Sequence, residues 1–122
     1  TLNIMGNDSK IYFVPYRGNF TRGIFTSIYM KFDDDVEDVK TIYKDFYENH
    51  PFTFLSKNDI NLKEVINTNN CHVKIESHES IIHITTVIDN LLKGASGQAV
   101  QNLNIIFGYE ESLGLNFKGS IY

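Results

Sequence analysis

Apolar and polar residues alternate along several stretches of this chain of 122 residues. The longest alternation covers residues 24–32, where mostly aliphatic side chains fall on one face and aromatic, serine and lysine side chains fall on the other. A period of two predicts a β-strand, because successive side chains of a strand point to opposite faces of its sheet. Residues 72–77 and 81–88 predict two strands that face each other, and short apolar runs predict strands at 11–14 and 52–55.

Two stretches have the spacing of helices. Residues 36–47 place apolar side chains three and four positions apart, and Asp33, Asp34 and Asp35 precede them as candidate caps for the free N–H groups. The alternative, a cation site at these aspartates, lacks the glycine turn and the distal glutamate of a calcium loop. A second helix is expected from about 93 to 107. The apolar stripe of the first helix is Val36, Val39, Ile42, Tyr43, Phe46 and Tyr47.

The order of these elements predicts an α+β fold with a mixed, largely antiparallel sheet and helices on one face. The turn between the two facing strands is expected near His78 and Glu79. Residues 56–70 are polar and predict a long connection that contains a short strand, and residues 113–121 offer a possible edge strand. At this length we expect one domain, residues 1–122.

Composition excludes several classes of function. Fifteen acidic residues against eleven basic ones give a net charge of −4, which opposes nucleic-acid binding. No apolar run reaches the roughly 18 residues that span a bilayer, so an integral membrane protein is excluded. One cysteine, Cys71, cannot form an internal disulfide and favours a reducing, cytoplasmic setting. The chain begins with Thr1 and no signal-peptide pattern follows, so we expect a piece of a longer protein.

The residues that most often carry chemistry do not form a catalytic or metal-binding pattern. Cys71 and His72 are neighbours in a predicted strand and point to opposite faces, so they cannot form a dyad. The four histidines lack the close spacing of metal ligands, and we expect no metal site. His83 is placed to lie opposite Glu76 across the strand pair.

Two segments could instead hold a ligand. Arg22 lies in a glycine-containing loop, where its guanidinium fork suits a carboxylate or a phosphate, and a solvated surface loop is the alternative. Lys93, Gly94 and Gly97 begin the second predicted helix directly after a strand, where free N–H groups attract anions. The segment lacks the leading glycine of the dinucleotide-binding pattern. The alternative is that the small residues on one face of this helix simply pack against the sheet.

Residues 89–102, DNLLKGASGQAVQN, resemble a signature of the N-acetyl-gamma-glutamyl-phosphate reductase family, which is related to aspartate-semialdehyde dehydrogenase. Shorter segments, residues 13–15, 22–24 and 43–52, support the resemblance, which covers nearly all of residues 11–119. The loop before Arg22 departs from the family pattern. Tyr16 stands where a histidine is expected, Asn19 where a proline is expected, and Gly18 where an aliphatic residue is expected.

The resemblance implies the carboxy-terminal portion of an enzyme of arginine biosynthesis. That enzyme uses NADPH to reduce N-acetyl-glutamyl phosphate to N-acetylglutamate semialdehyde through a thioester on a cysteine. The glycine-rich nucleotide-binding domain, the nucleophilic cysteine and the acid–base histidine of the family have no counterpart here, and Cys71 does not match the nucleophile's context. We therefore expect no catalytic residue in this chain and no activity from the chain alone.

The resemblance also implies roles for particular residues. Arg22 is expected to bind the substrate, and Lys93, Gly94 and Gly97 are expected to border the NADP site. The fold is expected to resemble the C-terminal domain of the glyceraldehyde-3-phosphate and aspartate-semialdehyde dehydrogenases. We further expect self-association, as a homodimer or larger, through the sheet face opposite the helices, with Phe25, Tyr29 and residues 81–88 as candidate contacts. The alternative is a stand-alone dimerisation or ligand-binding module without catalysis.

Overall fold

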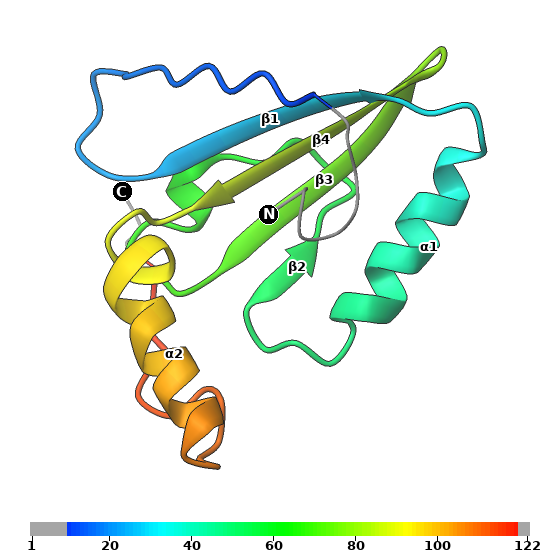
Figure 1. The fold of residues 1–122 in the computed structure, drawn as a ribbon. Coiled ribbons are helices and arrows are strands. Elements are labelled where there is room, and N and C mark those ends of the chain that lie inside the picture. Colours follow the sequence, from blue (N-terminus) through cyan, green and yellow to red (C-terminus); the bar gives the residue numbers. More distant parts are fainter. Residues whose placement is uncertain (1–9, 120–122) are drawn as a thin grey trace.

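Four β-strands form one sheet in the computed structural model, which describes residues 10–119 (Figure 1). The order across the sheet is β1-β4-β3-β2. Strand β4 pairs antiparallel with both of its neighbours, and β2 pairs parallel with β3. The predicted α+β fold with a mixed, largely antiparallel sheet is therefore confirmed. The strands are β1 (Ile24–Lys31), β2 (Thr53–Leu55), β3 (Cys71–His78) and β4 (Ile81–Ile88).

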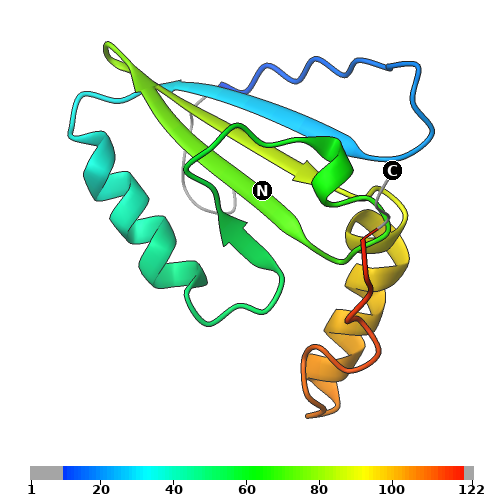
Figure 2. The same ribbon diagram turned by 180° about the vertical axis from the view of Figure 1, so that it is seen from behind.

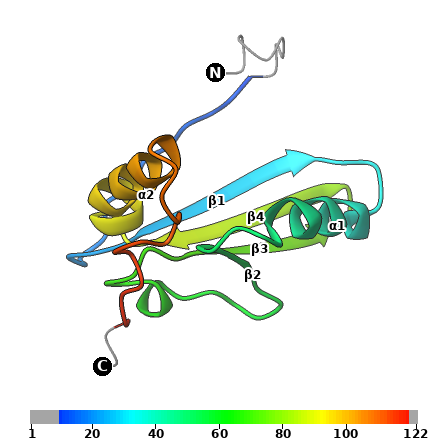
Figure 3. The ribbon, with the colours of Figure 1, turned by 90° about the horizontal axis from the view of Figure 1, so that it is seen from below.

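Two α-helices lie on the same side of the sheet (Figure 3). They are α1 (Val36–Tyr47) and α2 (Gly97–Ile106), and a π-helical turn, η2 (Leu92–Ser96), leads into α2. The 3-10 turn η1 (Leu62–Glu64) lies on the other side. Figure 2 shows it in front of the strands. None of the helices between residues 10 and 119 is long and apolar enough to cross a bilayer.

The strand register defines two faces of the sheet. On the face that carries the α-helices, here the helix face, Ile28 lies beside Ile84 and Ile84 beside Ile75. Val39 of α1 packs on this face with Val73, Ile75, Ile82 and Ile84 to form the buried core. The opposite face, here the open face, carries Phe25, Ser27, Tyr29 and Lys31 of β1, Ile81, His83, Thr85 and Val87 of β4, and His72, Lys74, Glu76 and His78 of β3.

Several local predictions are confirmed. Helix α1 has the predicted bounds, and the Asp35 carboxylate caps it by accepting a hydrogen bond of 3.0 Å from the Glu37 N–H. Strands β3 and β4 form the predicted pair, with the turn at Glu79, whose φ of 55° is left-handed, and His83 lies opposite Glu76.

Four local predictions are wrong. Residues 11–14 form no strand: they pair with no strand of the described sheet, and a strand needs such a partner to be stable. Residues 56–70 contain η1 in place of the predicted short strand, because Asn61 caps a turn there. Residues 113–119 form turns and coil without an edge strand, and residues 120–121 lie outside the described part. Ile42 and Phe46, expected on the inner stripe of α1, are exposed.

Candidate functional site

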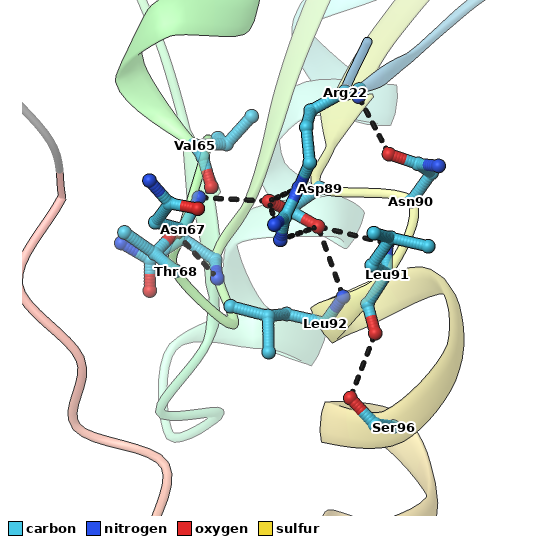
Figure 4. Close-up of polar contacts among 11 residues, drawn as sticks. Arg22, Val65, Asn67, Thr68, Asp89, Asn90, Leu91, Leu92 and Ser96 are labelled. Atoms are coloured by element: carbon cyan, nitrogen blue, oxygen red, sulfur yellow. Dashed lines mark hydrogen bonds and ion pairs between the residues drawn. The ribbon is translucent and has the colours of Figure 1, made fainter.

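The carboxylate of Asp89 joins three segments of the chain directly after β4 (Figure 4). Arg22 approaches from the loop before β1, with Nη2 2.9 Å from Oδ1 and Nε 3.1 Å from Oδ2. The N–H of Asn67 donates to Oδ2 at 2.8 Å, and the N–H groups of Leu91 and Leu92 donate to Oδ1 at 2.8 and 2.9 Å. The Asp89 side chain is 0% exposed, so its two carboxylate oxygens are shielded from water.

The hydrogen bonds decide the ionisation of Asp89. Burial alone would raise the pKa of this carboxyl, since it disfavours the charged form. The Arg22 guanidinium and the N–H groups of Asn67, Leu92 and Leu91 stabilise the carboxylate more strongly, and together they lower the pKa to about 2. Asp89 is therefore a buried anion that holds the loop before β1, the segment after η1 and the start of η2 together.

A second contact fixes the same loop. The Asn90 side-chain oxygen accepts a hydrogen bond of 2.7 Å from the Gly23 N–H. Gly23 has a φ of 110°, and a Cβ atom there would lie 2.6 Å from Leu62, so this position requires glycine. We call Arg22, Gly23, Asn67, Asp89 and Asn90 the junction. Sequence reasoning missed Asp89, although an aspartate between a strand and a helix start is a signal for capping.

Arg22, the predicted substrate-binding residue, belongs to this junction. Its Nε and Nη2 are both bound to Asp89, and its side chain is 29% exposed. The guanidinium fork is thus occupied inside the chain. Of the three guanidinium nitrogens of Arg22, only Nη1 has no hydrogen-bond partner among the described residues. A substrate anion would therefore have to bind at Nη1. The substrate role of Arg22 stays a prediction.

Lys93 and Gly94 lie in η2 and Gly97 is the first residue of α2, but the N–H groups of the two glycines are already used. The Gly94 N–H donates to the Asp89 carbonyl, and the Gly97 N–H donates to the Leu92 carbonyl. A Cβ atom on Gly97 would lie 2.3 Å from the Asn69 side chain, so Gly97 is needed for close packing. Gly94 is exposed and has ordinary space around it. Their cofactor role stays a prediction.

A cleft of about 420 Å³ opens on the helix face between α1 and α2. The Lys93 ammonium lines it, donates to the Gln101 side-chain oxygen at 2.6 Å and lies 5.9 Å from the centre of the Phe52 ring. Burial lowers the pKa of Lys93 and raises the pKa of the Cys71 thiol, which also lines the cleft. A raised thiol pKa opposes nucleophilic chemistry by Cys71.

Gln101 and Glu111 extend this polar network, and sequence reasoning missed both. Gln101 donates to Glu111 at 2.6 Å and accepts from Asn69 at 3.2 Å. The available signal was the spacing of Gly97, Gln101 and Asn104, which places small and polar residues on one side of α2. His72, by contrast, pairs with Glu64 on the open face, away from Cys71, as the strand geometry predicted.

Comparison with known proteins identifies the family of this chain. A family model described as "Semialdehyde dehydrogenase, dimerisation domain" matches residues 1–90, which include all four strands and every residue of the junction. The chain belongs to this family.

Three curated relatives carry the same name, N-acetyl-gamma-glutamyl-phosphate reductase. The protein of Karelsulcia muelleri is 52% identical over 97% of this chain, and that of Christiangramia forsetii is 51% identical over 93%. The protein of Parabacteroides distasonis is 46% identical over 93%. The chain spans only 37%, 36% and 35% of these relatives' lengths, respectively. The resemblance read from residues 89–102 is thereby confirmed.

Proposed function

We propose that the chain is the carboxy-terminal dimerisation portion of an N-acetyl-gamma-glutamyl-phosphate reductase. The observation that carries this proposal is the 52% identity over 97% of the chain to a protein of that name. Residues 1–122 would form one domain of a longer cytoplasmic enzyme of arginine biosynthesis. That enzyme would convert N-acetyl-glutamyl phosphate to N-acetylglutamate semialdehyde with NADPH, and its nucleophilic cysteine would lie in the part of the relatives that this chain does not span.

The junction supports a role for Arg22 at the substrate. Asp89 holds the guanidinium in one orientation, and a fixed cation binds an anion at a lower entropic cost than a mobile one. The exposed part of the side chain leaves Nη1 for a carboxylate or phosphate of the substrate. Arg22 would thus be a substrate-binding residue whose direction Asp89 sets.

The segment after the junction fits NADP only as a contact surface. Gly94, Ala95 and Ser96 are small and exposed, so another domain or a cofactor can approach their backbone closely. The N–H groups of Gly94, Ser96 and Gly97 are already bound to carbonyl groups, so they do not form a phosphate cradle. Lys93 is directed to Gln101 and adds positive charge beside this surface. Lys93, Gly94 and Gly97 would border the NADP site without holding its phosphates.

The open face supports self-association. Residues 56–70 cover one end of it through two ion pairs, Asp59 with Lys74 and Glu64 with His72. Strand β1, at the edge of the sheet, leaves Phe25 and Tyr29 exposed by 51% and 66%. An exposed apolar surface on a dimerisation domain is most simply covered by a second copy, and a homodimer through this face is our proposal.

A chimeric reductase tests the function. The matching third of the Christiangramia forsetii reductase is replaced by this chain, and reduction of the acyl phosphate is assayed with NADPH. We expect an active chimera, and no turnover by the isolated chain with N-acetylglutamate semialdehyde, NADP and phosphate. A folded, associated chimera without activity would contradict the proposal and favour the alternative of a non-catalytic module.

The same chimera tests Arg22. Arg22→Lys keeps a cation for Asp89 and removes Nη1, so we expect a higher KM for the acyl phosphate with little change in the KM for NADPH. Lys63→Arg, on the exposed surface of η1, is a control that should leave both constants unchanged. Equal changes in both KM values would assign Arg22 to the junction alone.

A further inference from the structure

An unusual backbone conformation marks one residue of the junction. In the described part of the chain, two residues other than glycine have a left-handed backbone: Asn67, with a φ of 63°, and Glu79, with a φ of 55°. Glu79 lies in the tight turn between β3 and β4, where the geometry of a hairpin calls for such a conformation. Asn67 follows η1 and lies in no hairpin, so its conformation needs another reason.

The Asn67 N–H holds one of the two oxygens of the Asp89 carboxylate (Figure 4). It donates to Oδ2 at 2.8 Å, while the N–H groups of Leu91 and Leu92 donate to Oδ1. The Arg22 fork contacts both oxygens, with Nη2 2.7 Å from Oδ2 and 2.9 Å from Oδ1. N–H groups from two segments therefore prevent the carboxylate from rotating, and the orientation of the guanidinium follows that of the carboxylate.

The left-handed backbone of Asn67 is what makes this contact compatible with the packing of the chain that follows. Thr68 and Asn69 are both buried, directly after the residue whose N–H reaches Asp89. The Thr68 hydroxyl donates to the Val65 carbonyl at 2.7 Å and so fixes the turn from inside. A residue confined to negative φ would either withdraw Thr68 and Asn69 from the interior or turn the preceding N–H away from Asp89.

We propose that Asn67 is a positioning residue for substrate binding: its left-handed backbone fixes Oδ2 of Asp89 and, through it, the direction in which Arg22 presents Nη1. This inference rests on the proposed substrate role of Arg22 and adds to it a residue from another segment. In this role Asn67 acts through Asp89 and does not contact the substrate. Such an effect is measurable, because a group misplaced by about 1 Å can cost about 100-fold in rate.

Two variants separate the backbone of Asn67 from its side chain. Asn67→Gly removes the side chain and adopts a positive φ freely, whereas Asn67→Val removes the side chain and strongly disfavours a positive φ. In the isolated chain, the nuclear magnetic resonance signal of the Arg22 Nε–H group reports the contact with Asp89. We expect Asn67→Gly to keep this signal in place. Asn67→Val should shift it and speed its exchange with water by about tenfold or more.

Kinetics of the chimeric reductase test the consequence for the substrate. Asn67→Val should raise the KM for the acyl phosphate about tenfold and leave kcat and the KM for NADPH within about twofold. Asn67→Gly should keep all three constants close to those of the unchanged chimera. Glu79→Val is the matched control, because it places the same residue at the other left-handed position, in a turn outside the junction. It should lower stability as well but leave the Arg22 signal and the KM unchanged.

The outcomes separate this inference from the proposed function. If Arg22→Lys raises the KM for the acyl phosphate and Asn67→Val does not, the inference fails and the substrate role of Arg22 stands. It also fails if Asn67→Val leaves the Arg22 signal unchanged, or if Asn67→Gly or Glu79→Val raises the KM as much as Asn67→Val does. If the signal shifts and neither Asn67→Val nor Arg22→Lys raises the KM, the substrate role of Arg22 itself fails. Should Asn67→Val not fold, Asn67→Ala takes its place with the same expected directions.

Discussion

Helices α1 and α2 lie on the same face of the sheet, but they are held there by different means. Val39 of α1 is 8% exposed and packs with Val73 and Ile75 of the sheet. The side of α2 that is turned inward carries Gly97, Gln101 and Asn104, which are buried, small or polar. The apolar residues of α2 point outward, and the exposed members of this set are Val100, Leu103, Ile105 and Ile106.

The difference shows how each helix is held on the sheet, although Ile42 and Phe46 of α1 are also exposed. Apolar burial fixes α1, and the described sheet supplies the partners of its buried side. Hydrogen bonds fix α2: Asp89 holds the turn before it, Gln101 binds Lys93 and Glu111, and Asn104 donates to two carbonyl groups of the segment that follows. An outward apolar stripe is the pattern of a helix that packs against another domain. The relatives, nearly three times as long as the matched region, have room for such a domain.

The largest effect is expected at the junction. Asp89→Ala leaves the Arg22 guanidinium and three N–H groups without their shared acceptor, so the free energy of unfolding should fall by about 3–5 kcal/mol. Urea unfolding of the isolated chain measures this loss. Asp59→Ala removes a carboxylate from an exposed ion pair with Lys74 and should leave the stability close to that of the unchanged chain. Similar losses in the two variants would mean that the junction does not hold the α2 side.

Acid should weaken the same junction. The folded pKa of Asp89 is lowered to about 2 from the ordinary 3.8, so its contribution is complete above about pH 4 and is lost as the pH falls toward 2. The shift corresponds to about 2.5 kcal/mol at most. We expect the stability difference between the unchanged chain and Asp89→Asn to shrink by about this amount between pH 5 and 2. The other carboxyl groups titrate equally in the unchanged chain and in Asp89→Asn. A stability difference that stays constant with pH would rule out Asp89 as the source of the acid sensitivity.

The sequence predicted the elements whose partners lie close along the chain. Strands 72–77 and 81–88 have a turn between them, and α1 carries its own cap at Asp35, so local pattern was sufficient. The strand at 11–14 failed, because a strand is stable only beside a partner and the described sheet offers none to it. The pairing of Asp89 with Arg22 could not be predicted, since the two residues lie 67 positions apart and only the folded sheet brings their side chains together.

The sequence predicted where the residues of the candidate site lie better than it predicted what they contact. Lys93, Gly94 and Gly97 were expected at a helix start with free N–H groups. The structure places them at the start, but a π-helical turn uses N–H groups of Gly94 and Gly97. Helical periodicity of 3.6 residues does not anticipate such a turn, and the need for glycine at 97 comes from Asn69, a residue remote in sequence.

A pair of glycine variants tests how closely α2 approaches the sheet. Gly97→Ala would place its Cβ 2.3 Å from the buried Asn69 side chain and 2.9 Å from the Leu92 backbone, so we expect a loss of about 2 kcal/mol despite the better helix propensity of alanine. Gly94→Ala meets no atom closer than 3.4 Å and should be neutral or slightly stabilising. Thermal unfolding of both variants is the measurement. Equal stability of the two would show that close packing does not determine the position of α2.

The smallest effects are expected from substituting one valine by alanine on each of the two α-helices. Val39→Ala removes two methyl groups from the core under α1 and should cost about 1.5 kcal/mol, the transfer free energy of two buried methyl groups. Val100→Ala removes the same groups from the outward side of α2, where the side chain is 40% exposed. The better helix propensity of alanine offsets most of the lost contact, so the change in the isolated chain should stay within about 0.5 kcal/mol. In the chimeric reductase the other domain would cover Val100, and the same substitution should then lower stability measurably. A cost at Val100 in the isolated chain equal to that at Val39 would show that α2 already has its apolar partner within these residues.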